Sequence, residues 1–362
     1  MREAARRPGF TLIELLIAST IMLVLVVGAL TIFSRGNKVS ADQQQYIELQ
    51  NDVRGAMFYL TRDIRMAGTE LPSGLAGYVL QGFDNESTGT SETPDRLRIL
   101  GNIENPLALQ ITKYQGSSAT ITVADYSFEQ YPYTDAYYVG KIVLVLPSPS
   151  SACKGCAFRA ITQVRHNANG SNEGFNFSPG RAPGINPPGG LSDICGDSEF
   201  DGGLILFADA REYWLDVTGS VSGLTAGQNG YIGGGTGGVL YMTLNGVYYP
   251  LAQNIESIQF QYNGDFDGDA EGLLDGFQDW NTAWTIDQIG RIREVRVQIL
   301  GRTRNVIASV GKVASPSLHL YRRPALANTA AASADDWHKR FLLESSCAIR
   351  NLTLNLYNTG MR

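Results

Sequence analysis

The sequence is poor in the residues that most catalytic sites need. It contains only three histidines, and they have no local spacing that would group them as metal ligands. It has no Gly-x-Ser-x-Gly elbow, and its glycine-rich run at 233–238 lacks the lysine of a phosphate-binding loop. These absences exclude the common patterns of hydrolases and nucleotide-binding enzymes, so we do not expect an enzyme.

Charge is also scarce, and negative charge prevails. Charged residues make up 18% of the chain, and its formal net charge is −6. An acidic protein offers no general attraction for phosphate backbones, so we do not expect nucleic acid as a partner. Aromatic residues make up 10% and hydrophobic residues 43%, a composition that indicates a folded rather than a disordered chain.

Proline is missing from residues 9–71, and the longest apolar run lies in this interval. Residues 10–33 read FTLIELLIASTIMLVLVVGALTIF and carry a single charge. As a helix this run would extend about 36 Å, which is enough to cross a hydrocarbon core of roughly 30 Å. The preceding MREAARRPG is net positive, which favours a cytoplasmic N-terminus and a chain that lies beyond the membrane after residue 33. The run is about twice as long as that of a secretory signal peptide.

The single charge in this run is Glu14. A carboxylate near the middle of a membrane costs about 2.5–3.5 kcal/mol on insertion scales, so it needs a partner. The simpler alternative is that the side chain reaches back to the nearby interface.

The residues around Glu14 resemble a processing motif. Gly9-Phe10 followed by Thr-Leu-Ile-Glu, behind a short basic leader, resembles the cleavage and methylation motif of the type IV pilin superfamily. The resemblance implies that a prepilin peptidase cuts after Gly9 and methylates the new amine of Phe10. It implies an inner-membrane intermediate that enters a filament, where Glu14 pairs with the Phe10 amine of a neighbouring subunit. The leader carries three arginines and one glutamate, so its removal takes the net charge from −6 to −8.

Beyond the apolar run, apolar residues continue at helical spacing. This pattern predicts an amphipathic stem that ends near Ala67, before Gly68 and Pro72. Without a proline, the helix should be unkinked, with Gly28 as its most flexible point. The expected buried stripe comprises Tyr46, Leu49, Val53, Met57, Leu60, Ile64 and Ala67. The residues expected to be solvated are Asp42, Gln43, Gln44, Glu48, Asp52 and Arg54.

The rest of the chain has the pattern of β structure. Segments rich in Val, Ile, Tyr and Phe alternate with loops rich in Gly, Asn, Ser and Pro. We therefore expect an α+β fold in which a long N-terminal helix, half transmembrane and half amphipathic stem, packs on a β-rich head. The expected division is a leader at 1–9, a transmembrane and filament-core helix at 10–33, a stem at 34–68 and an extracytoplasmic head at 69–362. The expected strands are 96–103, 119–124, 141–146, 158–165, 203–208, 213–217, 239–244, 255–262, 292–302 and 340–352.

Two sequence segments point to one group within this superfamily. Residues 51–68 resemble the end of the stem in PilW-type minor pilins, and residues 340–352 are more loosely similar to their last strand. This implies a minor pilin that joins other minor and major pilins at the pilus tip, primes assembly, and ends in the extracellular pilus. Two alternatives stay open, a minor pseudopilin of a type II secretion system and a tip-located adhesin or binding module.

The four cysteines all lie beyond the membrane helix. An even number in an oxidising compartment favours two disulfides, and four cysteines allow three pairings. The pairing we favour joins Cys153 to Cys156 and Cys195 to Cys347. The competing pairing joins the Cys-x-x-Cys segment to Cys195. Zinc is disfavoured because there is no second Cys-x-x-Cys.

An acidic run at 263–272 is the main candidate for a ligand site. Oxygen ligands that alternate in a glycine-rich turn can converge on a calcium ion, and like charges so close together repel one another without a cation. Ala270 stands where an EF-hand has glycine, so this is not an EF-hand. The alternative is a solvated acidic loop that caps a hairpin. The candidate ligands are Asp265, Asp267, Asp269 and Glu271, with Asp275 and Asp279 as possible later ones.

Overall fold

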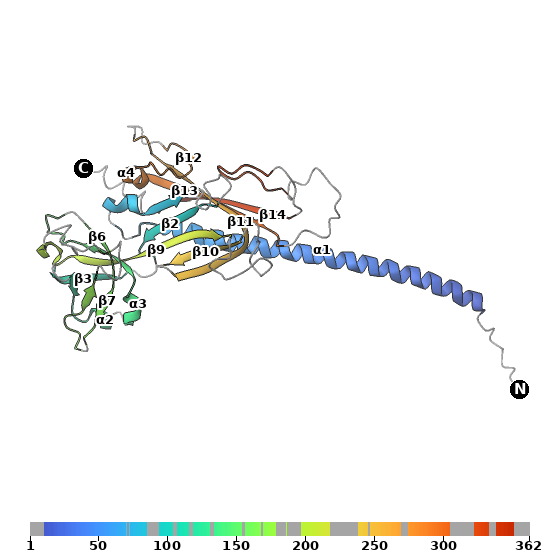
Figure 1. Cartoon of the computed structure of the whole chain (residues 1–362), viewed down its shortest axis with the longest axis horizontal. Coiled ribbons are helices and arrows are strands. Elements are labelled where there is room, and N and C mark those ends of the chain that lie inside the picture. Colours follow the sequence, from blue (N-terminus) through green and yellow to red (C-terminus); the bar gives the residue numbers. More distant parts are fainter. Residues whose placement is uncertain are drawn as a thin grey trace.

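The computed structural model consists of one long helix and a β-rich head (Figure 1). It describes residues 11–69, 71, 73–84, 94–103, 107–115, 119–130, 134–153, 156–167, 169–178, 186, 197–217, 238–244, 247–268, 274–304, 322–332 and 338–350.

The helix α1 runs without a break from Leu12 to Met66. In Figure 1 its first half leaves the head as a bare rod, and its second half lies inside the head. The three glycines within it do not interrupt it, because a helical glycine costs only about 1 kcal/mol relative to alanine and removes no hydrogen bond. Gly68, with φ of +74°, turns the chain just past the end of α1. The expected long, unkinked helix is confirmed.

Within its described residues, the head contains fourteen strands and several short helices. The strands are β1 (Leu80–Phe83), β2 (Arg96–Gly101), β3 (Ala108–Gln115), β4 (Thr120–Val123), β5 (Ile142–Leu146), β6 (Ala157–Ala160), β7 (Gln163–Arg165), β8 (Gly174–Asn176), β9 (Leu204–Asp216), β10 (Gly238–Leu244), β11 (Val247–Gly264), β12 (Phe277–Gln278), β13 (Ile292–Arg302) and β14 (Arg340–Ala348). The short helices are η1 (Ser73–Tyr78), α2 (Ser127–Gln130), α3 (Asp135–Tyr138), η4 (Asp197–Phe200) and α4 (Ile286–Gly290).

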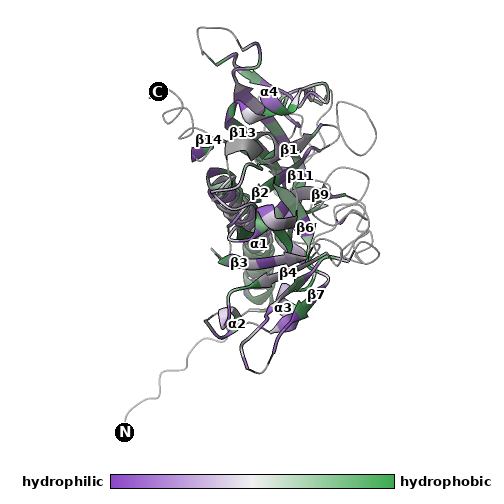
Figure 2. Cartoon of the chain, turned by 90° about the vertical axis from the view of Figure 1, so that its left-hand side faces the viewer, coloured by the Kyte–Doolittle hydropathy of each residue, from purple (hydrophilic) through white to green (hydrophobic). Residues whose placement is uncertain are grey.

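The strand order is β14-β13-β11-β10-β9-β3-β4-β8-β7, and the pairs in this path are antiparallel. Strands β2 and β5 also pair with β9, each carrying a partner of its own, β1 and β6. The long strand β9 therefore belongs both to the sheet around α1 and to a second lobe. Seen end-on, that lobe with α2, α3 and β7 lies at the opposite end of the head from α4 and β13 (Figure 2).

The larger core lies between α1 and the sheet. The expected stripe is buried from Leu49 to Ala67, and Tyr46 packs against its edge. It meets side chains from β2, β9, β10, β11, β13 and β14. At about 1.5–3 kcal/mol for each large apolar side chain, this burial fixes the stem to the head. The approach is closest at Gly301, where an added Cβ would lie 2.5 Å from Leu49 Cδ1.

The structure corrects one expectation about the stem. Asp42 was expected to be solvated, but it is only 4% exposed. It lies seven residues, or two helical turns, before Leu49, so it shares the buried face of α1. Asp52 is half-buried, and burial raises the pKa of its carboxyl group.

The structure also corrects several strand boundaries. The expected strands 203–208 and 213–217 are one strand, β9, which runs through the charged segment between them. The expected strand 158–165 is divided into β6 and β7. Strands β1, β3, β8 and β12 were missed: β1, β8 and β12 are too short to show a pattern, and β3 is longer but rich in polar residues.

Candidate functional site

The processing motif lies at the free end of α1. Gly9 and Phe10 are outside the described residues, which begin at Thr11. Thr11 is the N-cap of α1, and its hydroxyl accepts a hydrogen bond from the Glu14 backbone N–H at 3.3 Å. In return the Glu14 carboxylate accepts 2.9 Å hydrogen bonds from the backbone N–H and the hydroxyl of Thr11. These bonds form a capping box, which begins the helix two residues beyond the predicted cleavage point.

This arrangement supplies a local partner that the sequence reasoning overlooked. The Thr-x-x-Glu spacing of residues 11–14 is the sequence signal of a capping box. The sequence analysis predicted only a partner for Glu14 on a neighbouring subunit, which is what the pilin resemblance implies. In the single chain, Thr11 satisfies the carboxylate of Glu14. Pairing of Glu14 with the Phe10 amine stays a prediction, because it involves a second subunit.

The first half of α1 is exposed on every side. Every residue from Leu12 to Ala41 is exposed, including Leu12 at 78% and Ile32 at 74%. The helix is long and apolar enough to cross a membrane by length and composition. Hydroxyl groups in this half, such as those of Ser19, Thr20 and Thr31, bond carbonyl oxygens three or four residues earlier. Their polar groups are thus satisfied within the helix, as an apolar surrounding requires.

A buried charged network joins the other half of α1 to the sheet. Asp63 is fully buried, and its Oδ2 accepts hydrogen bonds from Arg211 Nη1 and the Tyr213 hydroxyl on β9. Its Oδ1 accepts a 2.9 Å bond from Arg62 Nε. Burial, followed by the charge of Asp63, raises the pKa of Tyr213 well above its usual range. The network was not foreseen, because the sequence separates Asp63 from its β9 partners by about 150 residues.

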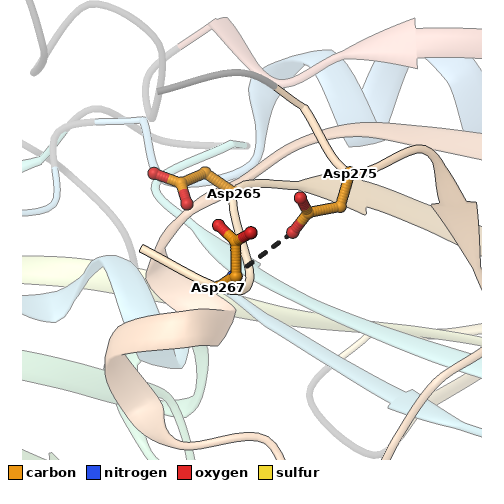
Figure 3. Close-up of side chains that lie close together, drawn as sticks. All are labelled: Asp265, Asp267 and Asp275. Atoms are coloured by element: carbon orange, nitrogen blue, oxygen red, sulfur yellow. Dashed lines mark hydrogen bonds between the residues drawn. The ribbon is translucent and has the colours of Figure 1, made fainter. Parts of the chain in front are cut away.

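Two aspartates of the acidic run and the later Asp275 lie close together just after β11. Ligand oxygens of Asp265, Asp267 and Asp275 lie within 4.8 Å of one another. In Figure 3 the carboxyl group of Asp267 lies between the other two. Asp269 and Glu271 lie outside the described residues. Asp275, seen in the sequence only as a later ligand, is thus a full member of the cluster.

The protein itself already satisfies part of this cluster. Asp275 Oδ2 accepts hydrogen bonds from the backbone N–H groups of Phe266 at 2.6 Å and Asp267 at 3.3 Å. Asp265 Oδ1 accepts one from the Gly268 N–H at 2.8 Å. Asp279 instead accepts a 3.1 Å bond from Gln261 Nε2. The oxygen donors suit calcium, and calcium binding stays a prediction.

Comparison with known proteins gives its clearest result at the end of the helix. Residues 5–30 match the family model of the prokaryotic N-terminal methylation motif. Over 121 residues the chain is 27% identical to the Pilin-like protein PilA3 of Thermus thermophilus, a match that covers 33% of this chain and 49% of that protein. The motif and the pilin-like relative support a place in the type IV pilin superfamily.

The match to this pilin-like relative is partial. The chain spans about half the length of PilA3. A type IV-like pilin structure from Thermus thermophilus aligns with 60% of this chain and 90% of its own, at 12% identity and a TM-score of 0.22. The motif match covers only the start of the chain, and the head must be interpreted from its own residues.

The cysteines of this pilin correct the favoured pairing. Cys153 forms a disulfide, whereas Cys156 and Cys347 are free thiols, so neither Cys153–Cys156 nor Cys195–Cys347 is formed. Cys153 packs on the core of the second lobe, and Cys156 packs with Leu144 on the other face of β5. Cys347 is buried against α1. Cys195 is outside the described residues, and the competing pairing of the Cys-x-x-Cys segment with Cys195 stays a prediction.

Proposed function

We propose that this protein is a PilW-like minor pilin that primes pilus assembly from the tip. Prepilin peptidase would remove residues 1–9, residues 10–33 would anchor the chain in the inner membrane, and residues 34–68 would carry the head at 69–362 outside it. The observation that supports this proposal most is the coincidence of the methylation motif with a helix half that is bare on all sides. In an assembled pilus, this half would pack against other pilins.

The capping box suggests how Glu14 could come to pair with the amine of Phe10 on a neighbouring subunit. Cleavage after Gly9 would leave a positively charged amine on Phe10, next to Thr11. When the bare helix enters an apolar filament core, the low dielectric would strengthen the attraction between the Glu14 carboxylate and the amine of a neighbouring Phe10. Glu14 would then give up or share its hydrogen bonds from Thr11 and form an ion pair with the amine. Neither charge would be left without a partner in the apolar core.

The size of the head favours a minor over a bulk subunit. The head would extend over residues 69–362, and its described residues include a second lobe beside the sheet that holds α1. Such a lobe would hinder close lateral packing if every subunit carried it. A subunit at the tip has one free end, where this bulk is tolerated.

Deletion of the gene separates the three roles. Loss of surface pili with normal protein secretion supports the minor pilin. Loss of secretion with normal pili would instead identify a pseudopilin, and normal pili with lost attachment would identify an adhesin. Mass spectrometry of the purified protein should find an N-methylated Phe10 at the start of the chain, and an uncleaved Met1 in a host with active peptidase would contradict the proposal.

Replacement of Glu14 tests the assembly step itself. Glu14→Val should insert in the membrane and be cleaved normally, but it should fail to restore pili in the deletion strain. The matched control is Ile13→Val, which keeps the charge and changes a neighbouring exposed residue. Normal piliation with Glu14→Val would rule out the charge pair.

A further inference from the structure

A hollow opens beside the last turns of α1, at the end of the helix away from its bare half. Its volume is about 400 Å³, and its lining includes Thr69 just beyond α1 and Arg350 just after β14. Of the lining residues on α1, Phe58 is 64% exposed and the side chain of Arg62 is 43% exposed. Arg65 and Arg350 are exposed as well. We call it the arginine hollow, after Arg62, Arg65 and Arg350, which line it together with Phe58.

The three arginines of the hollow differ in their partners. Arg62 donates a 2.9 Å hydrogen bond to Asp63, whose carboxylate is fully buried and is also bonded from β9. Among the described residues, neither Arg65 nor Arg350 forms an ion pair with a carboxylate. Arg65 hydrogen-bonds the thiol of Cys347, an uncharged group because burial raises its pKa. Within the described part of this acidic chain, the hollow therefore presents two exposed guanidinium groups without a negative partner.

The backbone on both sides of the hollow is held by the main core. On α1, Leu60 and Ile64 are fully buried against the sheet. Beside Arg350, Ile349 is fully buried in the same core, and its backbone N–H donates a 2.9 Å hydrogen bond to the carbonyl of Arg293. A ligand therefore has to order only the side chains of the hollow, which keeps the entropic cost of binding low.

We propose that the arginine hollow binds an acidic segment of a neighbouring subunit. Carboxylates of the segment accept charge-assisted hydrogen bonds from Arg65 and Arg350, a geometry that guanidinium groups favour. An apolar side chain between these carboxylates covers the ring of Phe58, as aromatic residues are covered at protein interfaces. The hollow lies on the same helix as the bare half, so a subunit that packs along α1 passes it. The inference thus rests on the proposed role in assembly and adds the chemistry of one contact.

Other occupants fit the arginine hollow less well. At 1.5 Å per residue, Arg65 lies about 48 Å along the helix from Phe33, where the apolar run ends, so lipid headgroups at that point do not reach it. A nucleic acid needs many phosphate contacts, whereas this acidic chain offers two unpaired guanidinium groups here. A small anion would pair with the guanidinium groups but would leave the ring of Phe58 uncovered.

Binding of short synthetic peptides to the full chain in non-ionic detergent micelles tests the proposal. The probe peptide carries glutamates on both sides of a single leucine. One comparison peptide has glutamine in place of each glutamate, and the other has serine in place of the leucine. Isothermal titration calorimetry should show a dissociation constant for the probe that is lower by about tenfold than for the glutamine peptide, and clearly lower than for the serine peptide. The measurement needs no pilus, so this inference and the role in assembly can fail separately.

Substitutions in the hollow identify the groups that bind the probe. The double variant Arg65→Gln with Arg350→Gln should weaken binding by about tenfold or more, because it removes both unpaired guanidinium groups. Phe58→Ala should weaken it by about threefold, since the leucine loses its ring contact. All of these side chains are exposed, so the variants should fold, which circular dichroism checks.

Arg54→Gln is the matched control, because it removes an exposed guanidinium from the same helix outside the hollow. It should leave binding of the probe unchanged. Absence of binding, or equal binding by the parent and the double variant, would overturn the proposal. A loss in Arg54→Gln as large as in the double variant would also overturn it, because it would show general charge attraction. Equal affinity for the serine peptide would contradict it as well, since it would show a simple anion site.

Discussion

The two halves of α1 share one continuous backbone but have opposite surroundings. From Leu12 to Ala41 every residue is exposed, and most of these residues are apolar. From Leu49 to Ala67 one stripe is buried in the head, and polar residues occupy much of the remaining surface. An apolar surface of such length does not stay in water in a soluble protein. Within the described part of the chain, the second half of the helix is packed against the head and the first half is not.

The difference also separates two kinds of stabilisation. The first half needs a lipid or protein surrounding, because its helix is apolar all round. The second half owes its position to apolar burial and to a buried charge that only the folded head satisfies. Changes in the second half should therefore alter the unfolding of the head, and equivalent changes in the first half should not.

The largest effect is expected from the buried charge in the second half. Asp63→Ala should lower the free energy of unfolding by about 3–5 kcal/mol, because it leaves Arg211 buried without its carboxylate. Urea unfolding of the full chain in micelles, followed by tryptophan fluorescence, measures the loss. The double variant Asp63→Leu with Arg211→Met should recover much of it. A loss below 1 kcal/mol would show that the network does not secure the stem.

The next effect compares two leucines, one in each half. Leu60→Ala should cost about 2–5 kcal/mol, since it opens a cavity in the main core. Leu25 is 67% exposed, and Leu25→Ala should leave the unfolding of the head unchanged. The same urea titration serves both variants. Similar losses for the two leucines would mean that the bare half also contributes to folding of the head.

Calcium should affect the head alone. If the cluster binds weakly, as in many extracellular modules, millimolar calcium should stabilise the head by roughly 1–3 kcal/mol. Differential scanning calorimetry should show a raised melting temperature, and Asp267→Ala should abolish the shift. Asp279→Ala, which changes an aspartate bonded to Gln261 outside the cluster, should keep it. An unchanged melting temperature at millimolar calcium would show that the cluster does not bind calcium.

The smallest effect concerns Glu212, on the face of the sheet away from the stem. Burial raises the pKa of Glu212, but the hydrogen bonds and charges of Arg96 and Arg98 outweigh it, so the pKa lies below its usual value. The pairs should therefore stabilise the head at neutral pH and lose their effect as the pH falls through this lowered pKa.

Glu212→Gln should accordingly lower the free energy of unfolding at pH 7 by about 1–2 kcal/mol. Urea titrations at a series of pH values should show that the difference from the parent disappears in acid. A difference that persists at the acid end would mean that packing, rather than the ion pairs, is what Glu212 supplies.

The helix was easier to predict from the sequence than the head. Its apolar run, its stripe from Leu49 to Ala67 and its end at Gly68 follow from local spacing, and the structure confirms them. In the head, local spacing failed at β9, where two strands were predicted on either side of a charged segment. In the structure Arg211 and Glu212 are both inside the strand, because each finds an opposite charge on another element.

The candidate sites show the same limit. Local spacing identified Glu14 and the acidic run, since their residues are close in sequence. It did not decide the cysteines, because the pairing depends on which face of a strand each thiol occupies.

By itself, the sequence determined that this protein has an N-terminal methylation motif followed by a long, partly apolar helix. The motif, the membrane-length apolar run and the buried stripe of the stem are each formed by residues close in sequence. A helix repeats every 3.6 residues, so these patterns can be recognised without knowing any distant contact. Only the tertiary structure decided how the head holds the stem. The partners of Asp63 and the cluster of Asp265, Asp267 and Asp275 both depend on strand register and loop geometry. These are fixed by long-range packing, since each strand finds its edge partner only when the whole sheet forms around α1.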